Sequence, residues 1–180
     1  MTMNLKPQDI VVALKLVALD GQSWGYVRLA AELCMSASEI NAAVKRGLKA
    51  GLLVPAVGES KNPLPNRKAL EEFLVHGVRY AFPPDRGELT RGVPTSYAAP
   101  PLNSTIMQSN EPPPVWASPE GKVRGYSFSP LYPSVPNAIA VDNELYELLV
   151  LVDAIRDSRT RERNLAVTEL KKRLASVCRQ

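Results

Sequence analysis

Apolar residues recur with helical spacing over most of the first 80 positions. The run Ile10–Leu19 is apolar on almost every side, which predicts a buried helix, and Pro7 is suited to its first turn. Amphipathic patterns predict three further helices near residues 26–34, 36–51 and 67–80. The N-terminal region is therefore expected to be a small helical domain.

The second and third of these expected helices are separated by a short turn. Ser36 and Glu39 have the S-x-x-E spacing of a capping box, which starts a helix just after the turn. The small residues Ala30 and Ala31 allow the two helices to approach closely. Together these features predict a helix-turn-helix.

The outward face of the third expected helix is small and polar at its start and basic further along. A helix that enters the major groove of DNA needs a slim start that hydrogen-bonds base edges and basic residues that reach phosphates. Asn41 could pair with adenine, Lys45 or Arg46 with guanine, and Glu39 with cytosine. The alternative is the solvated face of an ordinary helical hairpin. The predicted DNA-binding residues are Ser36, Ser38, Glu39, Asn41, Ala42, Lys45, Arg46 and Lys49, with Tyr26, Arg28, Lys61 and Arg67 outside this helix.

This segment resembles the winged helix-turn-helix domains of bacterial transcriptional regulators, in particular the multiple-antibiotic-resistance-regulator-like (MarR-like) group. The resemblance covers about residues 8–80 and implies that the helix matching Ser38–Lys49 lies in the major groove. It also implies that a β-hairpin after this helix touches the DNA backbone or the minor groove. The residues that carry it are Leu29-Ala30, Leu33, Met35-Ser36, Ser38-Glu39-Ile40, Val44, Leu48 and Ala50-Gly51-Leu52-Leu53.

The segment that matches the wing departs from the family pattern. Leu53-Val54 can start a strand, but Pro55, Pro63 and Pro65 limit ladder pairing. A hairpin and a plain loop both remain open. In either case Lys61 would lie near the tip or the returning segment, where it could contact phosphate.

Proline separates this domain from the rest of the chain, because twelve of the sixteen prolines fall between Pro83 and Pro136. The aromatic residues of the segment favour an extended arm that packs on the helices of its own or a partner chain. Alternatives are a disordered linker and a polyproline ligand. Residues 115–117 and 122–126 flank the turn sequence Ser118–Gly121, which predicts a β-hairpin within the arm.

Two amphipathic helices are expected at the C-terminal end, the first capped by Asp142 or Asn143 and the second over about 161–177. Short helices of this kind must bury their apolar faces against other elements. We expect them to form a homodimer interface, and the alternative is that they complete the core of one chain. The predicted interface residues are Leu145, Leu148, Leu149, Val152, Ile155, Leu170 and Leu174.

Composition limits the chemistry. His76 is the single histidine, and Cys34 and Cys178 fit no metal-ligand spacing. No phosphate-binding loop or paired acid motif is present, so we expect no enzyme activity, no cofactor and no metal. The net charge is +4, with ten Lys/Arg against seven Asp/Glu in residues 1–80. The sequence contains no signal peptide or apolar stretch long enough to span a membrane, so a cytoplasmic protein is expected.

These patterns predict a mainly α protein with three parts: a winged helix-turn-helix domain (1–82), a proline-rich arm with a β-hairpin (83–136) and a helical pair for dimerisation (137–180). The expected function is a homodimeric, sequence-specific regulator of transcription that binds double-stranded DNA and acts as a repressor. One alternative is an antitoxin whose arm or C-terminal helices bind a partner enzyme. Another is an adaptor whose winged domain binds only protein.

Overall fold

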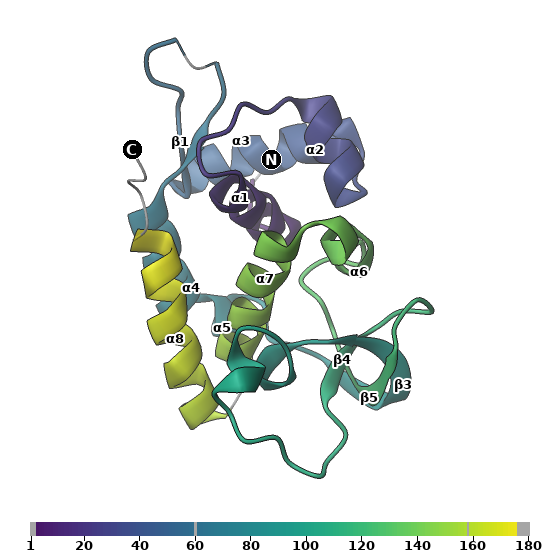
Figure 1. Ribbon diagram of the computed structural model, residues 1–180. Helices are drawn as coiled ribbons and strands as arrows, with labels where there is room; N and C mark the ends of the chain where they lie inside the picture. Colours follow the sequence, from purple (N-terminus) through teal and green to yellow (C-terminus); the bar gives the residue numbers. More distant parts are fainter. Residues whose placement is uncertain (1–2, 60, 158, 176–180) are drawn as a thin grey trace.

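The computed structural model describes residues 3–59, 61–157 and 159–175. The chain is mainly helical and carries a small sheet (Figure 1). The α-helices are α1 (Pro7–Leu19), α2 (Tyr26–Leu33), α3 (Ala37–Ala50), α4 (Arg67–His76), α5 (Val78–Ala81), α6 (Val135–Ala138), α7 (Asn143–Arg156) and α8 (Thr160–Ala175). The strands are β1 (Leu53–Val54), β2 (Leu64–Pro65), β3 (Arg86–Pro94), β4 (Pro114–Ala117) and β5 (Val123–Phe128), and short 3₁₀ turns are η1 (Ser96–Ala98), η2 (Leu102–Ser104) and η3 (Ile139–Val141).

Helices α1, α2 and α3 form one end of the molecule, and α1 is its central element. The helix begins with Pro7 in its first turn, and Asp20 ends it in the left-handed conformation with φ 47°. Residues Ile10 to Leu14 are at most 1% exposed, because α3 covers one side of α1 and α7 covers another. The all-round apolar run therefore forms the buried helix that the sequence predicted.

A short hairpin follows α3. Strands β1 and β2 pair antiparallel, with Leu53 opposite Pro65 and Val54 opposite Leu64. The ladder is only two residues long on each side, because proline lacks the N–H that would extend it. In Figure 1 the loop that joins the two strands extends from the top of the molecule.

The helix expected over residues 67–80 is interrupted. Asn66 caps α4 by accepting a hydrogen bond from the backbone N–H of Ala69 (3.1 Å), and the helix ends at His76. Gly77 then separates α4 from the single turn of α5. Leu70, Leu74 and Val78 remain on one buried face, so the interruption leaves the apolar pattern facing the core.

The proline-rich segment folds into a sheet, which corrects both the extended arm and the hairpin. β4 and β5 are not hairpin partners: each pairs antiparallel with β3, and they run parallel to one another. The reason is strand β3, which the sequence pattern did not reveal. Its residues Gly92–Pro94 pair with β4, and its residues Arg86–Gly92 pair with β5. Glycines permit this close approach, since a Cβ on Gly125 would lie 2.0 Å from the Pro113 carbonyl oxygen and one on Gly92 would lie 2.1 Å from that of Trp116.

Helix α7 runs through the middle of the molecule, between the α1–α3 end and the sheet (Figure 1). Residues Leu148–Arg156 are all buried, and one continuous apolar cluster joins α1, α4, α7, α8 and the sheet. The core thus draws side chains from all three expected regions. Helix α8 covers α7 and α4 on one side.

The residues predicted to form a dimer interface lie inside this core, which corrects their assignment. None is more than 3% exposed, because α7 packs against α1, α4 and α8 of the same chain. They complete the core of one chain and have no surface left for a second copy. The residues concerned are Leu145, Leu148, Leu149, Val152, Ile155, Leu170 and Leu174.

The sheet is tied to α7 by a buried polar cluster around Asp153. Its carboxylate accepts hydrogen bonds from the Thr95 hydroxyl and the Trp116 indole N–H, both at 2.7 Å, and from Arg156 at 2.8 Å. Complete burial raises the pKa of Asp153, against the opposing effect of the Arg156 charge and the three hydrogen bonds. Arg156 also donates to the Phe82 carbonyl at 2.8 Å, so this cluster joins α7 to three segments that are distant from it in sequence.

Candidate nucleic-acid interface

The turn between α2 and α3 has well-defined hydrogen bonds. Helix α2 ends at Cys34 in the left-handed conformation with φ 53°, and the Met35 N–H donates to the Ala30 carbonyl at 3.0 Å. Ser36 then caps α3: its hydroxyl accepts from the Glu39 N–H at 3.2 Å, and the Glu39 carboxylate accepts from the Ser36 N–H at 2.7 Å. The predicted capping box is confirmed, and it sets where α3 begins.

One side of α3 faces away from the core. Ile40, Ala43 and Val44 are buried, while Ser38, Asn41, Lys45 and Lys49 are exposed and Ala42 is half-buried between them. A shallow hollow of about 310 Å³ lies over this side, lined by Met3, Ser38, Asn41, Ala42, Lys45 and Arg46. We call the set Ser38, Asn41, Ala42, Lys45 and Lys49 the α3 face.

Three polar side chains of the α3 face have no partner among the described residues. Within the part of the chain that the structure describes, no hydrogen bond or ion pair engages the side chains of Asn41, Lys45 and Lys49. The Ser38 hydroxyl lies 3.1 Å from that of Ser36. A slim amide, a small methyl group and two ammonium groups therefore line one side of a single helix.

Two predicted base-contacting residues are engaged within the chain, which corrects their role. Arg46 forms a two-pronged ion pair with the buried carboxylate of Asp9, at 2.7 and 2.8 Å, and this hydrogen bonding raises the pKa of Arg46. Glu39 accepts from the Tyr132 hydroxyl at 2.5 Å besides capping α3, and this hydrogen bond lowers the pKa of Glu39. Both side chains position α3, so neither is available to read a base.

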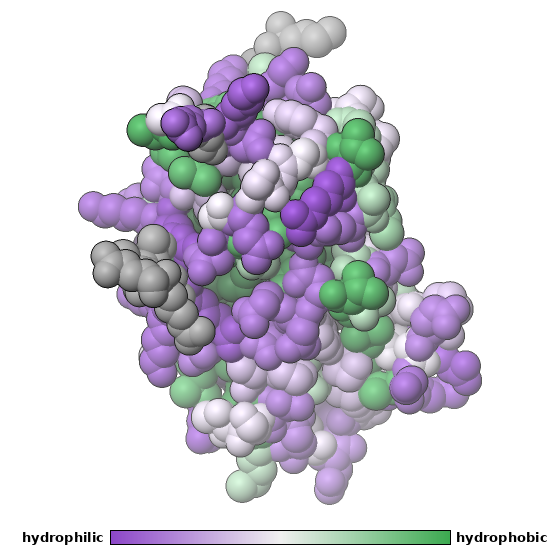
Figure 2. Space-filling model, turned by 45° about the horizontal axis from the view of Figure 1, so that its top comes forward, coloured by the Kyte–Doolittle hydropathy of each residue, from purple (hydrophilic) through white to green (hydrophobic). Residues whose placement is uncertain are grey.

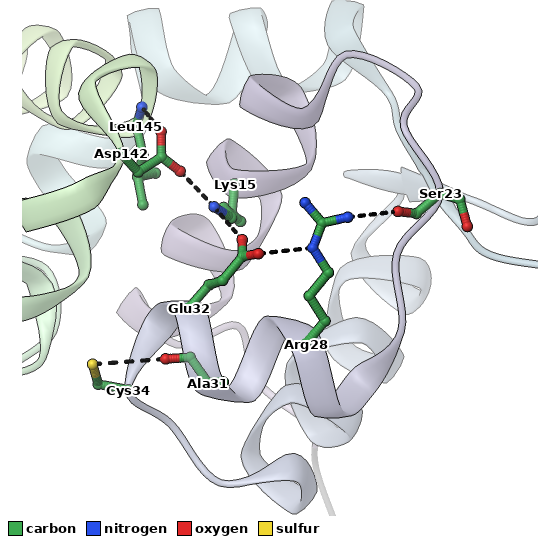
Figure 3. Close-up of polar contacts among 8 residues, drawn as sticks. All are labelled: Lys15, Ser23, Arg28, Ala31, Glu32, Cys34, Asp142 and Leu145. Carbon is green, nitrogen blue, oxygen red and sulfur yellow. Dashed lines mark hydrogen bonds and ion pairs between the residues drawn. The ribbon is translucent and has the colours of Figure 1, made fainter.

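Arg28 of α2, another predicted contact, also turns toward the protein. It donates to Glu32 at 2.7 Å and to the Ser23 carbonyl at 3.0 Å (Figure 3). The neighbouring Tyr26 is half-buried and packs edge-on against Trp24, with ring centroids 5.3 Å apart. These residues support the start of α2.

Arg67 and Lys61 differ in their surroundings. Arg67, at the start of α4, pairs with Asp20 at 2.9 Å and donates to the carbonyls of Arg173 and Leu174 at the end of α8. It therefore joins two elements of the core instead of reaching outward. Lys61 is exposed in the hairpin loop, beside Asn62, whose amide donates to the Trp24 carbonyl.

A buried lysine fixes α2 relative to α1 and α7 (Figure 3). The Lys15 ammonium of α1 lies 2.7 Å from Glu32 of α2 and 2.5 Å from Asp142, which caps α7. Burial alone would lower the pKa of Lys15, but the hydrogen bonds to Asp142 and Glu32 outweigh it and raise the pKa. The helix-turn-helix is thus anchored to α1 and to the start of α7 by a charged cluster.

Sequence reasoning missed Tyr132, Asp9 and Asp142 as residues that position the site. Tyr132 lies 93 positions from its partner Glu39, and Asp142 lies 127 from Lys15, so no local pattern pairs them. Asp9 was visible only as an acid in the first turn of α1. Its partner could be found only from the fold.

Figure 2 shows the upper end of the molecule as a mostly hydrophilic surface on which hydrophobic residues form separate patches. Within the described residues, no helix has both the length and the apolar character needed to cross a membrane.

Comparisons with protein families, with curated proteins and with solved structures found no match to the chain.

Proposed function

We propose that this protein is a sequence-specific DNA-binding regulator of transcription that places the α3 face in the major groove. The observation that carries the proposal is that the side chains of Asn41, Lys45 and Lys49 have no partner among the described residues. Their neighbours Arg46 and Glu39, by contrast, are hydrogen-bonded to other parts of the chain. An amide near the start of the helix suits adenine, and lysines one and two turns further suit guanine or phosphate.

The order of elements also supports this function. Three helices followed by a short antiparallel hairpin, α1 to α3 and then β1–β2, is the arrangement of winged helix-turn-helix domains. In such an arrangement the hairpin loop is the wing, and Lys61 is its phosphate-contacting residue. We propose that the protein acts in the cytoplasm and represses transcription by occupying a promoter. The apolar residues of α7 and α8 have no part in it, because they are buried within the chain.

The test is selection of duplexes from a random DNA pool, followed by affinity measurement on the enriched sequence. The variant Asn41→Ala/Lys45→Ala should lose roughly 30-fold or more in affinity, since each good base contact contributes about 1–3 kcal/mol. A matched control, Asn103→Ala/Lys171→Ala, removes one exposed amide and one exposed ammonium elsewhere and should keep wild-type affinity.

Two outcomes would contradict the proposal. One is unchanged affinity in the α3 variant, and the other is a wild-type protein that enriches no sequence. Salt dependence gives an independent measure, because log affinity should fall by about 0.9 per log unit of salt for each phosphate contacted. A flat salt response would favour an adaptor that binds protein.

A further inference from the structure

One face of the sheet carries an unusual combination of side chains. In the antiparallel register of β3 and β5, Leu89 lies opposite Tyr126 and Arg91 lies opposite Arg124. Because alternate residues of a strand share a face, all four side chains project from the same side. Lys122, just before β5, joins Arg91 and Arg124 around a hollow of about 290 Å³. We call these five residues the sheet platform.

Among the described residues, the cations of the sheet platform have no partner of opposite charge. The residues that line the hollow are Leu89, Thr90, Arg91, Lys122, Val123 and Arg124, with no carboxylate among them. Across the described ranges, no ion pair involves the side chains of Arg91, Lys122 or Arg124. Like charges directly opposite one another destabilise a sheet. An external anion would relieve this repulsion.

A nearby pocket on the same sheet shows the contrast. It is lined by Arg86 and Arg159, but Arg86 pairs with the buried Asp157, and Arg159 lies 3.6 Å from Glu111 and stacks 4.5 Å over the ring of Tyr97. Its positive charges are balanced within the chain. The platform is the place where this sheet presents cations without partners in the described structure.

The platform also exposes apolar surface beside its charges. Tyr126 is 46% exposed and Leu89 is 42% exposed, although the rest of this sheet buries Trp116 and Phe128 almost completely. Aromatic rings next to arginines are the means by which proteins bind unpaired nucleic-acid strands, because bases stack on the ring while cations hold the phosphates. A duplex keeps its bases stacked inside and would leave the Tyr126 ring unused.

We propose that the sheet platform binds a single-stranded segment of nucleic acid, with Arg91, Arg124 and Lys122 on phosphates and Tyr126 stacked on a base. Figure 1 shows β3 and β5 at the opposite end of the molecule from α3, with α7 between them. The platform is therefore separate from the α3 face, and it goes beyond the proposed reading of duplex DNA.

The test is fluorescence anisotropy with a labelled single-stranded oligothymidylate of about twelve nucleotides at low salt. The variant Arg91→Ala/Arg124→Ala should bind roughly tenfold or more weakly, with a salt slope lower by about 0.7 for each phosphate contact removed. The control Arg161→Ala/Lys171→Ala removes two exposed cations from α8 and should bind as wild type.

A second variant separates base stacking from charge attraction. Tyr126→Ser should weaken oligothymidylate binding about fivefold or more, because stacking on an aromatic ring contributes appreciably for each base. It should leave unchanged the binding of inorganic polyphosphate, which carries phosphates and no bases. Equal loss in the platform and α8 variants, or equal affinity of Tyr126→Ser and wild type for oligothymidylate, would overturn the proposal.

The melting temperature distinguishes loss of the binding charges from loss of the fold. Removing the opposed arginines relieves cross-strand repulsion, so Arg91→Ala/Arg124→Ala should melt at a higher temperature than wild type while binding more weakly. A variant that binds weakly because it unfolds would melt lower, which would contradict the inference. Duplex binding through the α3 face should be unaffected, so failure here is distinguishable from failure of the regulatory function.

Discussion

The two ends of the molecule are held together in different ways. The α1–α3 end relies on apolar side chains packed around α1 and on caps made by neighbours in sequence, such as Ser36 with Glu39. The sheet relies on close backbone approach at glycines and on hydrogen bonds to Asp153, which lies far along the chain. The difference shows that local patterns can define where a helix begins, whereas the sheet depends on hydrogen bonds to a residue 37 to 58 positions away in sequence.

The two ends also differ in how they present charge. On α3 the neighbouring arginine, Arg46, is neutralised by Asp9. The exposed positive charge of this helix therefore comes from its lysines. On the sheet platform two arginines face each other directly across the strands. Variants at both ends test whether this contrast governs stability as well as binding.

Removing the group that joins the sheet to α7 should cost the most stability. Asp153→Ala leaves Arg156 buried without its carboxylate, and losing one partner of a buried pair costs about 3–5 kcal/mol of unfolding free energy. Urea denaturation followed by the fluorescence of Trp116, in a Trp24→Phe background, measures the loss. The exposed Glu144→Gln on the same helix should change stability by no more than about 0.5 kcal/mol. A loss as small in Asp153→Ala would contradict the role assigned to the cluster.

The charged cluster at the other end of α7 should contribute less, because its carboxylates are partly exposed. Lys15→Met should cost about 2 kcal/mol, below the range for a fully buried pair. The hydrogen bond from Lys15 lowers the pKa of Glu32, so the stability that Glu32 provides is present at neutral pH and is lost as pH falls through that lowered value.

The same variant has a defined behaviour at alkaline pH. The raised pKa of Lys15 means that its contribution is complete below its ordinary value of 10.5 and is lost only as pH rises through the raised value. The difference between wild type and Lys15→Met should therefore be constant from above the ordinary Glu32 pKa of 4.5 up to about pH 10, and shrink at lower and higher pH. Chemical denaturation at several pH values measures it. A difference that grows in acid would refute the assignment.

A local change tests the claim that the α1–α3 end depends on neighbours in sequence. Ser36→Ala removes the cap of α3 and should cost about 1 kcal/mol. Thermal denaturation measures the change, with Ser38→Ala as the control because its hydroxyl caps no backbone group. Equal effects of the two substitutions would show that the cap does not set the start of α3.

The smallest expected effect is a gain in stability. Arg124→Ala removes one member of the opposed pair on the sheet platform, which should stabilise the fold by roughly 0.2–1 kcal/mol. Lys171→Ala, on the exposed side of α8, should leave the melting temperature unchanged. If Arg124→Ala is destabilising, the two arginines are held by contacts that outweigh their repulsion.

The helical end could be predicted from sequence because its signals are local. Pro7, the apolar run and the Ser36–Glu39 spacing each act within a few residues, and all three occur in the structure. The partners of Arg46 and Glu39 could not be predicted, because Asp9 and Tyr132 come from other elements. Charge pattern alone therefore assigned two positioning residues to the DNA-contacting set.

The remainder of the fold could not be predicted because its contacts are distant in sequence. The turn sequence at Ser118–Gly121 suggested a hairpin, but strand β3 is the partner of both flanking strands. The apolar face of α7 could be predicted, but periodicity shows only that a face is buried. It does not show which element covers that face. Pairing between distant elements decided both outcomes.

The place of α7 in the core has a consequence for how the chain is made. A ribosome delivers α1 first and α7 only after most of the other elements, although α7 covers one side of α1. Until Asn143–Arg156 emerges, the apolar side of α1 stays open to water or to a chaperone. Completion of the first helix's packing therefore waits on one of the last segments to be synthesised.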